Sequence, residues 1–173
     1  MKTFLRVPLA TLAALLLVAV GASATRQVAG GAVSIALAVP VIVWLGLETP
    51  VVEGAIGAAL VGVVLDGAAG GPGGLLTFLA VLAFVGVRAG AGPFDARSMP
   101  GFGLLSGAAA FGMGVGALLL TRYVSPPAQA PGWGLLGRVL VEALLTGLAA
   151  PPIRWVLDRV LVSSHRESHG VLR

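Results

Sequence analysis

The sequence predicts an all-α, polytopic membrane protein with about six transmembrane helices, and three observations lead to this fold class. Hydrophobic residues make up 57% of the 173 residues. Charged residues make up 10%, against about 25% in an ordinary soluble domain. The 26 Gly and 11 Pro interrupt long apolar runs, as they commonly do in membrane helices. A soluble fold of this length needs a polar surface, whereas a surface that faces lipid does not.

Six apolar segments approach the length of about 20 residues that a membrane-spanning helix needs. They cover residues 3–22, 29–47, 51–66, 75–87, 101–120 and a last stretch from 133 to 162. The third and fourth are short and could instead form one re-entrant hairpin. The Gly-rich link at 67–74 makes them antiparallel neighbours in either case. We therefore expect one transmembrane helical domain over residues 1–162 and a polar cytoplasmic tail over 163–173.

The distribution of basic residues predicts the orientation of the six segments. With an even number of spans, both termini lie on one side of the membrane. Eight basic residues fall on that side and three on the other, so the positive-inside rule places both termini in the cytoplasm. The two groups are Lys2, Arg6, Arg88, Arg97, Arg154, Arg159, Arg166 and Arg173, against Arg26, Arg122 and Arg138. Near the segment ends, Trp44, Trp133 and Trp155 are expected to act as interfacial anchors.

The first segment has an alternative interpretation as a cleaved signal peptide. Lys2 and Arg6 precede an apolar core at 9–20, and the sequence 22–24 has the small-x-small pattern of a cleavage site. Cleavage after Ala24 would leave five spans and place the two ends on opposite sides of the membrane.

The third segment carries a stripe of small residues that ends in a carboxylate. Gly54, Ala58, Gly62 and Asp66 follow one another at intervals of four, so they share one helix face. Small residues on that face allow another helix to approach closely. At the C-terminus of its helix Asp66 is disfavoured by the macrodipole, which predicts a cationic or hydrogen-bonding partner. Arg26, Arg122 and Arg138 are the cationic candidates, and the alternative is a solvated aspartate at the edge of a loop.

The last segment contains two ionisable pairs and a proline pair. Arg138 and Glu142 are four residues apart, as are Arg154 and Asp158, so each pair can meet on one helix face. Glu142 should lie one to two turns inside the apolar layer, where it is either a functional carboxylate or a group neutralised by Arg138. The geometry favours neutralisation. Pro151 and Pro152 lack backbone donors and predict a break or kink beside Arg154.

The sequence lacks the patterns that would indicate several kinds of binding or catalytic site. The Gly-rich run at 67–74 lacks the Lys-Ser/Thr of a phosphate-binding loop. His165 and His169 do not have zinc-protease spacing, and the absence of cysteine excludes disulfides and thiolate metal sites. The basic residues occur singly, which does not indicate nucleic-acid binding. We predict no catalytic activity, no metal and no cofactor.

Two stretches of the chain resemble the bacterial rod shape-determining protein MreD family. Residues 53–66, which end in Val63-Val64-Leu65-Asp66, match the Gly-rich helix of that family with its terminal Leu-x-x-Asp element. Gly71-Pro72-Gly73-Gly74 then occupies the place of its short Pro-Leu-Gly loop. The sequence from 136 to 146, with Pro151 and Leu157-Asp158-Arg159, resembles its last helix. At 28–32 the chain departs from the Pro-Asp-Leu-like element of many members.

The resemblance implies a non-enzymatic component of the cell-elongation machinery in the bacterial cytoplasmic membrane. Its implied partners are the membrane-anchored MreC and, with it, MreB, RodA and the transpeptidase partner of RodA. Together these proteins place peptidoglycan synthesis along the side wall. The family is also considered similar in fold to the substrate-binding components of energy-coupling-factor transporters. This similarity supplies a second hypothesis, a small-molecule-binding transport subunit, which the scarcity of polar and aromatic residues disfavours.

Overall fold

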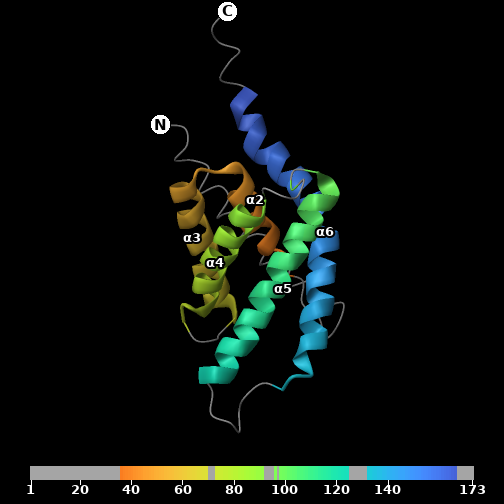
Figure 1. The fold of residues 1–173 in the computed structure, drawn as a ribbon. Coiled ribbons are helices and arrows are strands. Elements are labelled where there is room, and N and C mark those ends of the chain that lie inside the picture. The colour runs from red at the N-terminus through yellow and green to blue at the C-terminus, as the bar shows by residue number, and fades with distance from the viewer. Residues whose placement is uncertain (1–35, 70–72, 92–95, 97, 125–131, 167–173) are drawn as a thin grey trace, which may run out of the picture.

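The computed structural model describes residues 36–69, 73–91, 96, 98–124 and 132–166. Within these residues the chain forms five α-helices and no strand (Figure 1). The helices are α2 (Val39–Glu48), α3 (Val51–Ala69), α4 (Leu75–Gly90), α5 (Met99–Val124) and α6 (Leu135–Arg166). The all-α fold class is therefore confirmed. The predicted segment 3–22 and the cleavage site at Ala24 lie outside the described residues.

Three of these helices are long and apolar enough to cross a membrane. Their spanning stretches are Val51–Ala68 in α3, Met99–Val124 in α5 and Leu135–Arg159 in α6. The helices α2 and α4 are apolar but shorter. Both α3 and α4 extend beyond the predicted limits of 51–66 and 75–87, because helix continues into the edges of the Gly-rich link and through Arg88.

Helices α3 to α6 run alternately down and up the length of the molecule (Figure 1). The upper end contains the ends of α2 and α4 and the start of α5. The lower end contains the start of α4, the end of α5 and the start of α6. The most extensive packing joins α5 to α6, followed by α3 to α4, so the bundle consists of two antiparallel hairpins.

The short helix α2 forms the centre of the bundle, since it packs against all four other helices. All its residues from Val39 to Gly46 are buried. Of the predicted segment 29–47, only the part from Val39 is helical within the described residues, and Leu37 and Ala38 form a turn. Pro40 lies in the first helical turn, where its missing N–H costs no hydrogen bond, so it marks the start of the helix.

One sequence-based expectation about the upper end is wrong. Trp44 is not an exposed interfacial residue, because only 3% of it is exposed and it belongs to the central core. The predicted break or kink at Pro151 and Pro152 takes the form of a kink, because α6 stays helical through both prolines and changes direction there. The helix continues to Arg166, beyond the predicted limit at 162. A proline in a helix removes one backbone hydrogen bond without ending the helix when packing holds the flanking turns. Figure 1 shows the lower and upper parts of α6 running in different directions.

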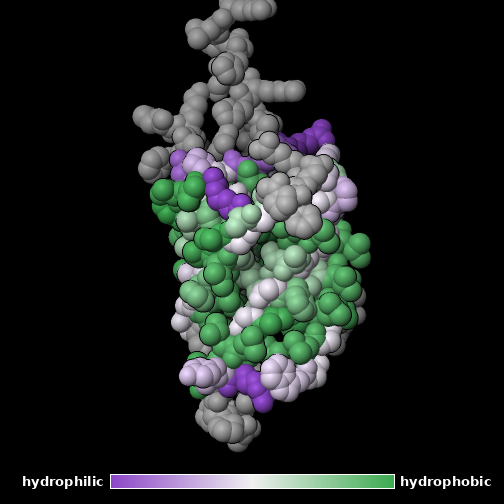
Figure 2. Space-filling view, in the orientation of Figure 1, coloured by the Kyte–Doolittle hydropathy of each residue, from purple (hydrophilic) through white to green (hydrophobic). Residues whose placement is uncertain are grey.

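The surface has the character expected of a helical membrane protein. In the face shown in Figure 2, a hydrophobic band lies between hydrophilic groups at the two ends. Large apolar side chains on the outer faces of three long helices are exposed. They include Val52, Ile56, Leu60 and Val63 on α3, Leu104, Phe111 and Leu119 on α5, and Leu140, Leu144 and Leu148 on α6. An exposed apolar surface of this extent would be unfavourable in water and favourable in lipid.

Candidate functional site

The small-residue stripe of α3 lies where this helix meets α4 and the end of α2. Ala58 is completely buried. A Cβ atom placed on Gly62 would overlap the backbone Cα of Thr77 in α4. A Cβ atom on Gly54 would lie 2.5 Å from Cε2 of Phe84, also in α4. Side chains at these positions would force the two helices apart, so the glycines determine how closely α3 and α4 approach.

Asp66 closes the turn of this hairpin by capping α4. Its Oδ2 accepts hydrogen bonds from the backbone N–H groups of Gly74 and Thr77, both at 3.0 Å. The same oxygen accepts one from the hydroxyl of Thr77 at 2.6 Å, and Oδ1 accepts one from the N–H of Leu76 at 2.8 Å. Gly74 is the N-cap residue of α4 and makes no side-chain cap of its own, so Asp66 satisfies the donors of the first turn from the preceding helix.

The prediction that Asp66 has a cationic or hydrogen-bonding partner is confirmed in its second form. The sequence indicated a cationic or a hydrogen-bonding partner, and the hydrogen-bond donors of α4 are the ones found. The carboxylate lies at the unfavourable end of its own helix dipole but at the favourable end of the next one. Gly74 has a φ of 89°, in the left-handed region that glycine adopts without a steric penalty. The candidate Pro72 lies outside the described residues.

A second polar cluster lies at the upper end, around Arg154 and Asp158. The two side chains pair along α6 as their spacing predicts, with 3.5 Å between Nε of Arg154 and Oδ2 of Asp158. Oδ1 of Asp158 accepts a hydrogen bond from the indole N–H of Trp44 at 2.9 Å. Asp158 thus joins the central helix α2 to the part of α6 that follows the proline pair.

Arg154 extends this cluster to α5 and to the segment before it. Its Nη1 donates to the carbonyl oxygen of Ala96 at 3.4 Å, and its guanidinium lies 5.1 Å from the ring centroid of Phe102. Only 11% of the Arg154 side chain is exposed. A charge with so little exposure needs partners, and here a carboxylate, a carbonyl and an aromatic face supply them.

Arg88 caps α2 at the same end. From the last turn of α4, its Nη1 donates to the carbonyl oxygens of Thr49 at 2.9 Å and Gly46 at 3.4 Å. These carbonyls belong to the C-terminal end of α2, where a cation is favoured by the helix dipole and by unpaired carbonyl oxygens.

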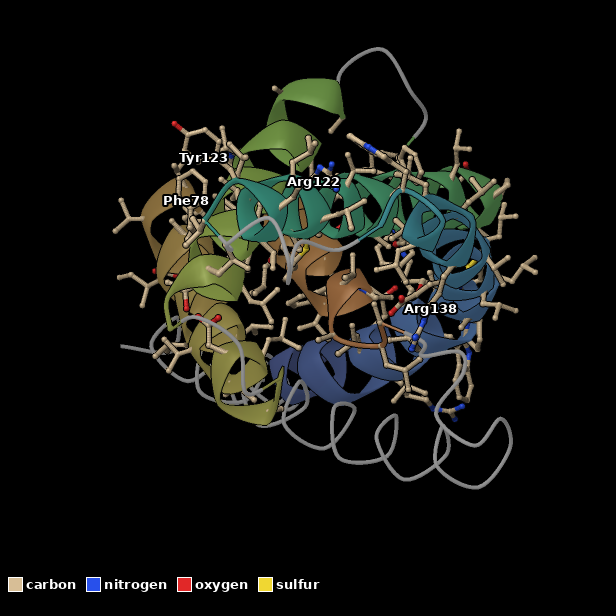
Figure 3. The ribbon with its side chains drawn as sticks, turned by 90° about the horizontal axis from the view of Figure 1, so that it is seen from below. Phe78, Arg122, Tyr123 and Arg138 are labelled. Carbon is tan, nitrogen blue, oxygen red and sulfur yellow. The ribbon has the colours of Figure 1, made fainter. Side chains whose placement is uncertain are left out.

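Arg138 and Glu142 line a shallow groove between α5 and α6 near the lower end. The groove has a volume of about 320 Å³, and its α5 wall includes Gly114, Ala117 and Thr121. Arg138 is exposed and Glu142 is partly buried. Figure 3 views this end, with Arg122 near the end of α5 and Arg138 near the start of α6. That Arg138 neutralises Glu142 stays a prediction.

The proline candidate Pro151 lies beside a point of close contact between α5 and α6. A Cβ atom on Gly103 would lie 2.9 Å from the carbonyl oxygen of Gly147 and 3.6 Å from the Pro151 ring. Because Pro151 has no N–H, the Gly147 carbonyl lacks its usual donor four residues later. This carbonyl instead faces Gly103, where a hydrogen atom stands in place of a Cβ.

Sequence reasoning missed Trp44, Thr77 and Arg88 as parts of these clusters. Trp44 and Arg88 act on residues more than 35 positions away in the chain, and no local periodicity encodes such pairs. Thr77 carried a usable signal, because a hydroxyl residue at the third position of a helix is a common participant in N-terminal capping.

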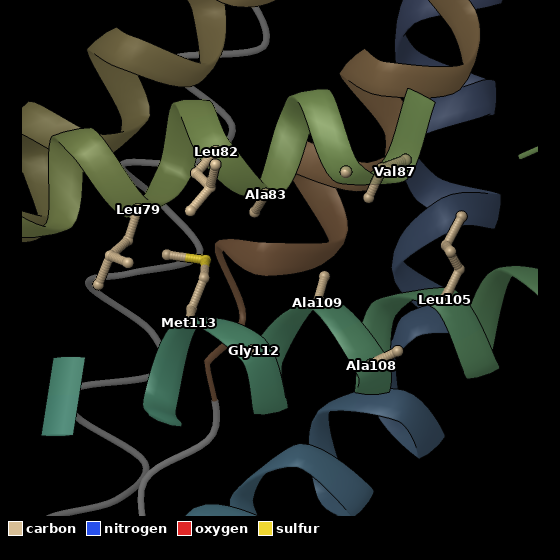
Figure 4. Close-up of a pocket in the computed structure, with 10 residues that line it drawn as sticks. Leu79, Leu82, Ala83, Val87, Leu105, Ala108, Ala109, Gly112 and Met113 are labelled. Carbon is tan, nitrogen blue, oxygen red and sulfur yellow. The ribbon is translucent and has the colours of Figure 1, made fainter. Parts of the chain in front are cut away.

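An apolar groove of about 300 Å³ separates parts of α4 and α5. Its walls include Leu79, Leu82 and Val87 from α4 and Leu105, Ala109 and Met113 from α5. Figure 4 shows side chains of the two helices facing each other across it. The described residues that line the groove include no charged side chain.

Comparisons of the chain with protein-family models, with curated proteins and with solved structures found no match. The fold and its contacts define the class of the molecule: an α-helical membrane protein with capped helix ends and an apolar exterior.

Proposed function

We propose that this chain is a non-enzymatic scaffold or assembly component of the bacterial elongation machinery, of the MreD type. It would regulate cell shape and side-wall peptidoglycan synthesis through contacts with MreC and, with it, MreB, RodA and the transpeptidase partner of RodA. The supporting observation is the hairpin of α3 and α4. The residues that carry the resemblance, from Gly54 to Asp66 and at Gly74, make the specific contacts of this hairpin.

The distribution of polar interactions is consistent with a protein that works by contact. The hydrogen bonds of Asp66 and Arg88 lie at helix ends, and that of Arg154 lies in the part of α6 after the proline pair; all three are directed at the fold itself. Between these ends the long helices present apolar outer faces to their surroundings. A rigid hairpin with an apolar exterior can hold a partner helix in the membrane, since packing rather than charge drives helix association in lipid.

The proposal includes six spans in the bacterial cytoplasmic membrane with both termini in the cytoplasm. Residues 3–22 would supply the first span, and α2 with the residues before it the second. Three of the described arginines lie toward the upper end of the bundle, namely Arg88, Arg154 and Arg159, and two lie toward the lower end, namely Arg122 and Arg138. By the positive-inside rule this excess supports a cytoplasmic upper end. The same arrangement would be similar to the substrate-binding components of energy-coupling-factor transporters.

The groove between α4 and α5 favours a second candidate function, a small-molecule-binding subunit of a transporter. Its volume of about 300 Å³ lies at the lower limit for a ligand pocket. A polar ligand also requires convergent hydrogen-bonding groups, and the lining is apolar. The scaffold proposal therefore has the stronger support.

Native purification from the host distinguishes the two candidates. We expect mass spectrometry of the co-purified proteins to identify elongation proteins, with an unrelated multi-span protein as the purification control. Recovery of an ATPase module or of a bound small molecule would instead support the transporter subunit. Asp66→Asn should reduce recovery of the partners because it loosens the hairpin, whereas Glu48→Gln, at an exposed position, should not.

A further inference from the structure

Two arginine–tryptophan pairs lie at opposite ends of the spanning part of α6. At the lower end, the guanidinium of Arg122 lies 5.0 Å from the ring centroid of Trp133. At the upper end, the guanidinium of Arg159 lies 4.9 Å from that of Trp155. From Leu135 to Trp155 the helix rises about 30 Å, which equals the thickness of the hydrocarbon core of a bilayer. The two pairs therefore bracket the apolar layer.

The upper pair continues the outward face of α6. Leu144, Leu148, Trp155 and Arg159 fall within about 60° of one another on a helix of 3.6 residues per turn. Leu144 is 61% exposed, Leu148 77% and Trp155 54%. Along this face the residues change from aliphatic to aromatic to basic, the order in which a helix leaves hydrocarbon and enters the headgroup region.

Arg159 differs from the two other arginines described at the upper end. Arg88 donates to carbonyl oxygens of α2, and Arg154 pairs with Asp158. Arg159 is exposed, and its contact among the described residues is the ring of Trp155. The guanidinium lies over the face of the indole, and a stacked guanidinium keeps the N–H groups at its edge available to bind an oxyanion.

We propose that Trp155 and Arg159 form a binding site for the phosphate of an anionic phospholipid headgroup. The indole holds the guanidinium at the level of the headgroups, and the N–H groups donate to the phosphate oxygens. The acyl chains of the same lipid then lie along Leu144 and Leu148. This site requires only that α6 crosses the bilayer, and it is independent of the proposed scaffold function.

Fluorescence quenching by brominated lipids tests the site directly. The Trp133→Phe variant, in vesicles of phosphatidylcholine, retains Trp155 as its exposed fluorophore, because Trp44 is 3% exposed. We expect brominated phosphatidylglycerol to quench Trp155 with about fivefold higher apparent affinity than brominated phosphatidylcholine, the preference of one basic side chain near an anionic surface. Equal quenching by the two lipids would overturn the proposal.

Variants of the two arginines locate the preference. Arg159→Gln should reduce the ratio of the apparent affinities for brominated phosphatidylglycerol and phosphatidylcholine to about one. Arg159→Lys should retain part of the preference, because the charge remains although the planar guanidinium that stacks on the indole is lost. Arg122→Gln, at the opposite end, should leave the ratio unchanged. A preference that survives Arg159→Gln would place the lipid elsewhere and contradict the proposal. Added inorganic phosphate, at constant ionic strength, should leave the quenching by brominated phosphatidylglycerol unaffected. If the added phosphate abolished the lipid preference, the site would be one for soluble phosphate instead.

Discussion

The α3–α4 and α5–α6 hairpins reach close packing by different means. In the first, the glycines of one helix receive parts of the other, with Gly62 against the backbone of Thr77 and Gly54 against the ring of Phe84. In the second, glycine faces glycine, because Gly103 and Gly147 approach each other's carbonyl oxygens. The first interface is one-sided, and the second is reciprocal at Gly103 and Gly147. A Cβ added at Gly62 or Gly147 would meet backbone atoms of the opposite helix, which cannot move aside as a flexible side chain can.

The two hairpins also differ in how their ends are secured. The α3–α4 turn is closed by four hydrogen bonds to the Asp66 carboxylate. The upper end of α5 and α6 is joined through Arg154, which reaches Ala96 and Phe102, and through Asp158, which binds Trp44 of α2. The lower turn of the first hairpin is thus closed by a local cap, whereas the upper end of the second is joined by side chains of α6 that reach α5 and α2. The variants below separate these contributions.

The largest expected effect follows from Gly62→Ala. Its Cβ would overlap the Thr77 backbone, so α3 and α4 must separate, and we expect the free energy of unfolding to fall by about 3 kcal/mol. Reversible unfolding in mixed micelles measures the change. Gly67→Ala in the same helix is the matched control, because no atom lies within 4 Å of the added Cβ. A loss at Gly67 equal to that at Gly62 would contradict the packing explanation.

Gly147→Ala tests the reciprocal interface and should cost about 2 kcal/mol. The new Cβ would lie 3.0 Å from the Gly103 carbonyl oxygen and 3.4 Å from the Cα of Gly107, both backbone atoms. Gly137→Ala is the control in α6, where the Cβ meets open space. The same unfolding assay applies. An unchanged midpoint for Gly147→Ala would show that α5 and α6 move apart at little cost.

The sequence predicts the parts of this structure that depend on local pattern. Apolar length predicts the long helices, a spacing of four predicts the pairing of Arg154 with Asp158, and the stripe ending in Asp66 predicts where a helix meets α3. The contacts of Trp44 and Arg88 could not be predicted, because each joins residues far apart in the chain. The proline pair predicts a break or a kink, and the structure shows a kink, since α6 is continuous through both prolines and changes direction there.

Removal of the Asp66 cap should produce a smaller loss than either glycine variant that introduces overlap with backbone. Asp66→Ala leaves the first-turn donors of α4 without their acceptor, and we expect a loss of about 1.5 kcal/mol in the free energy of unfolding. Asp66→Asn retains one acceptor oxygen and should lose less. Glu48→Gln, an exposed carboxylate at the other end, provides the control. Equal stability of Asp66→Ala and the unmodified protein would show that the turn needs no cap.

The contact between Trp44 and Asp158 should have the smallest effect, and a double-mutant cycle isolates it. Trp44→Phe removes the indole donor and Asp158→Asn removes the negative charge from its acceptor. We expect a coupling free energy of about 1 kcal/mol, because each single change already weakens the same hydrogen bond. Trp133→Phe combined with Asp158→Asn is the control pair and should be additive, since Trp133 lies at the lower end beside Arg122. Additivity in the Trp44 cycle would mean that this hydrogen bond does not help to join α6 to α2, and the two hairpins would then differ in their glycine packing and in the Asp66 cap.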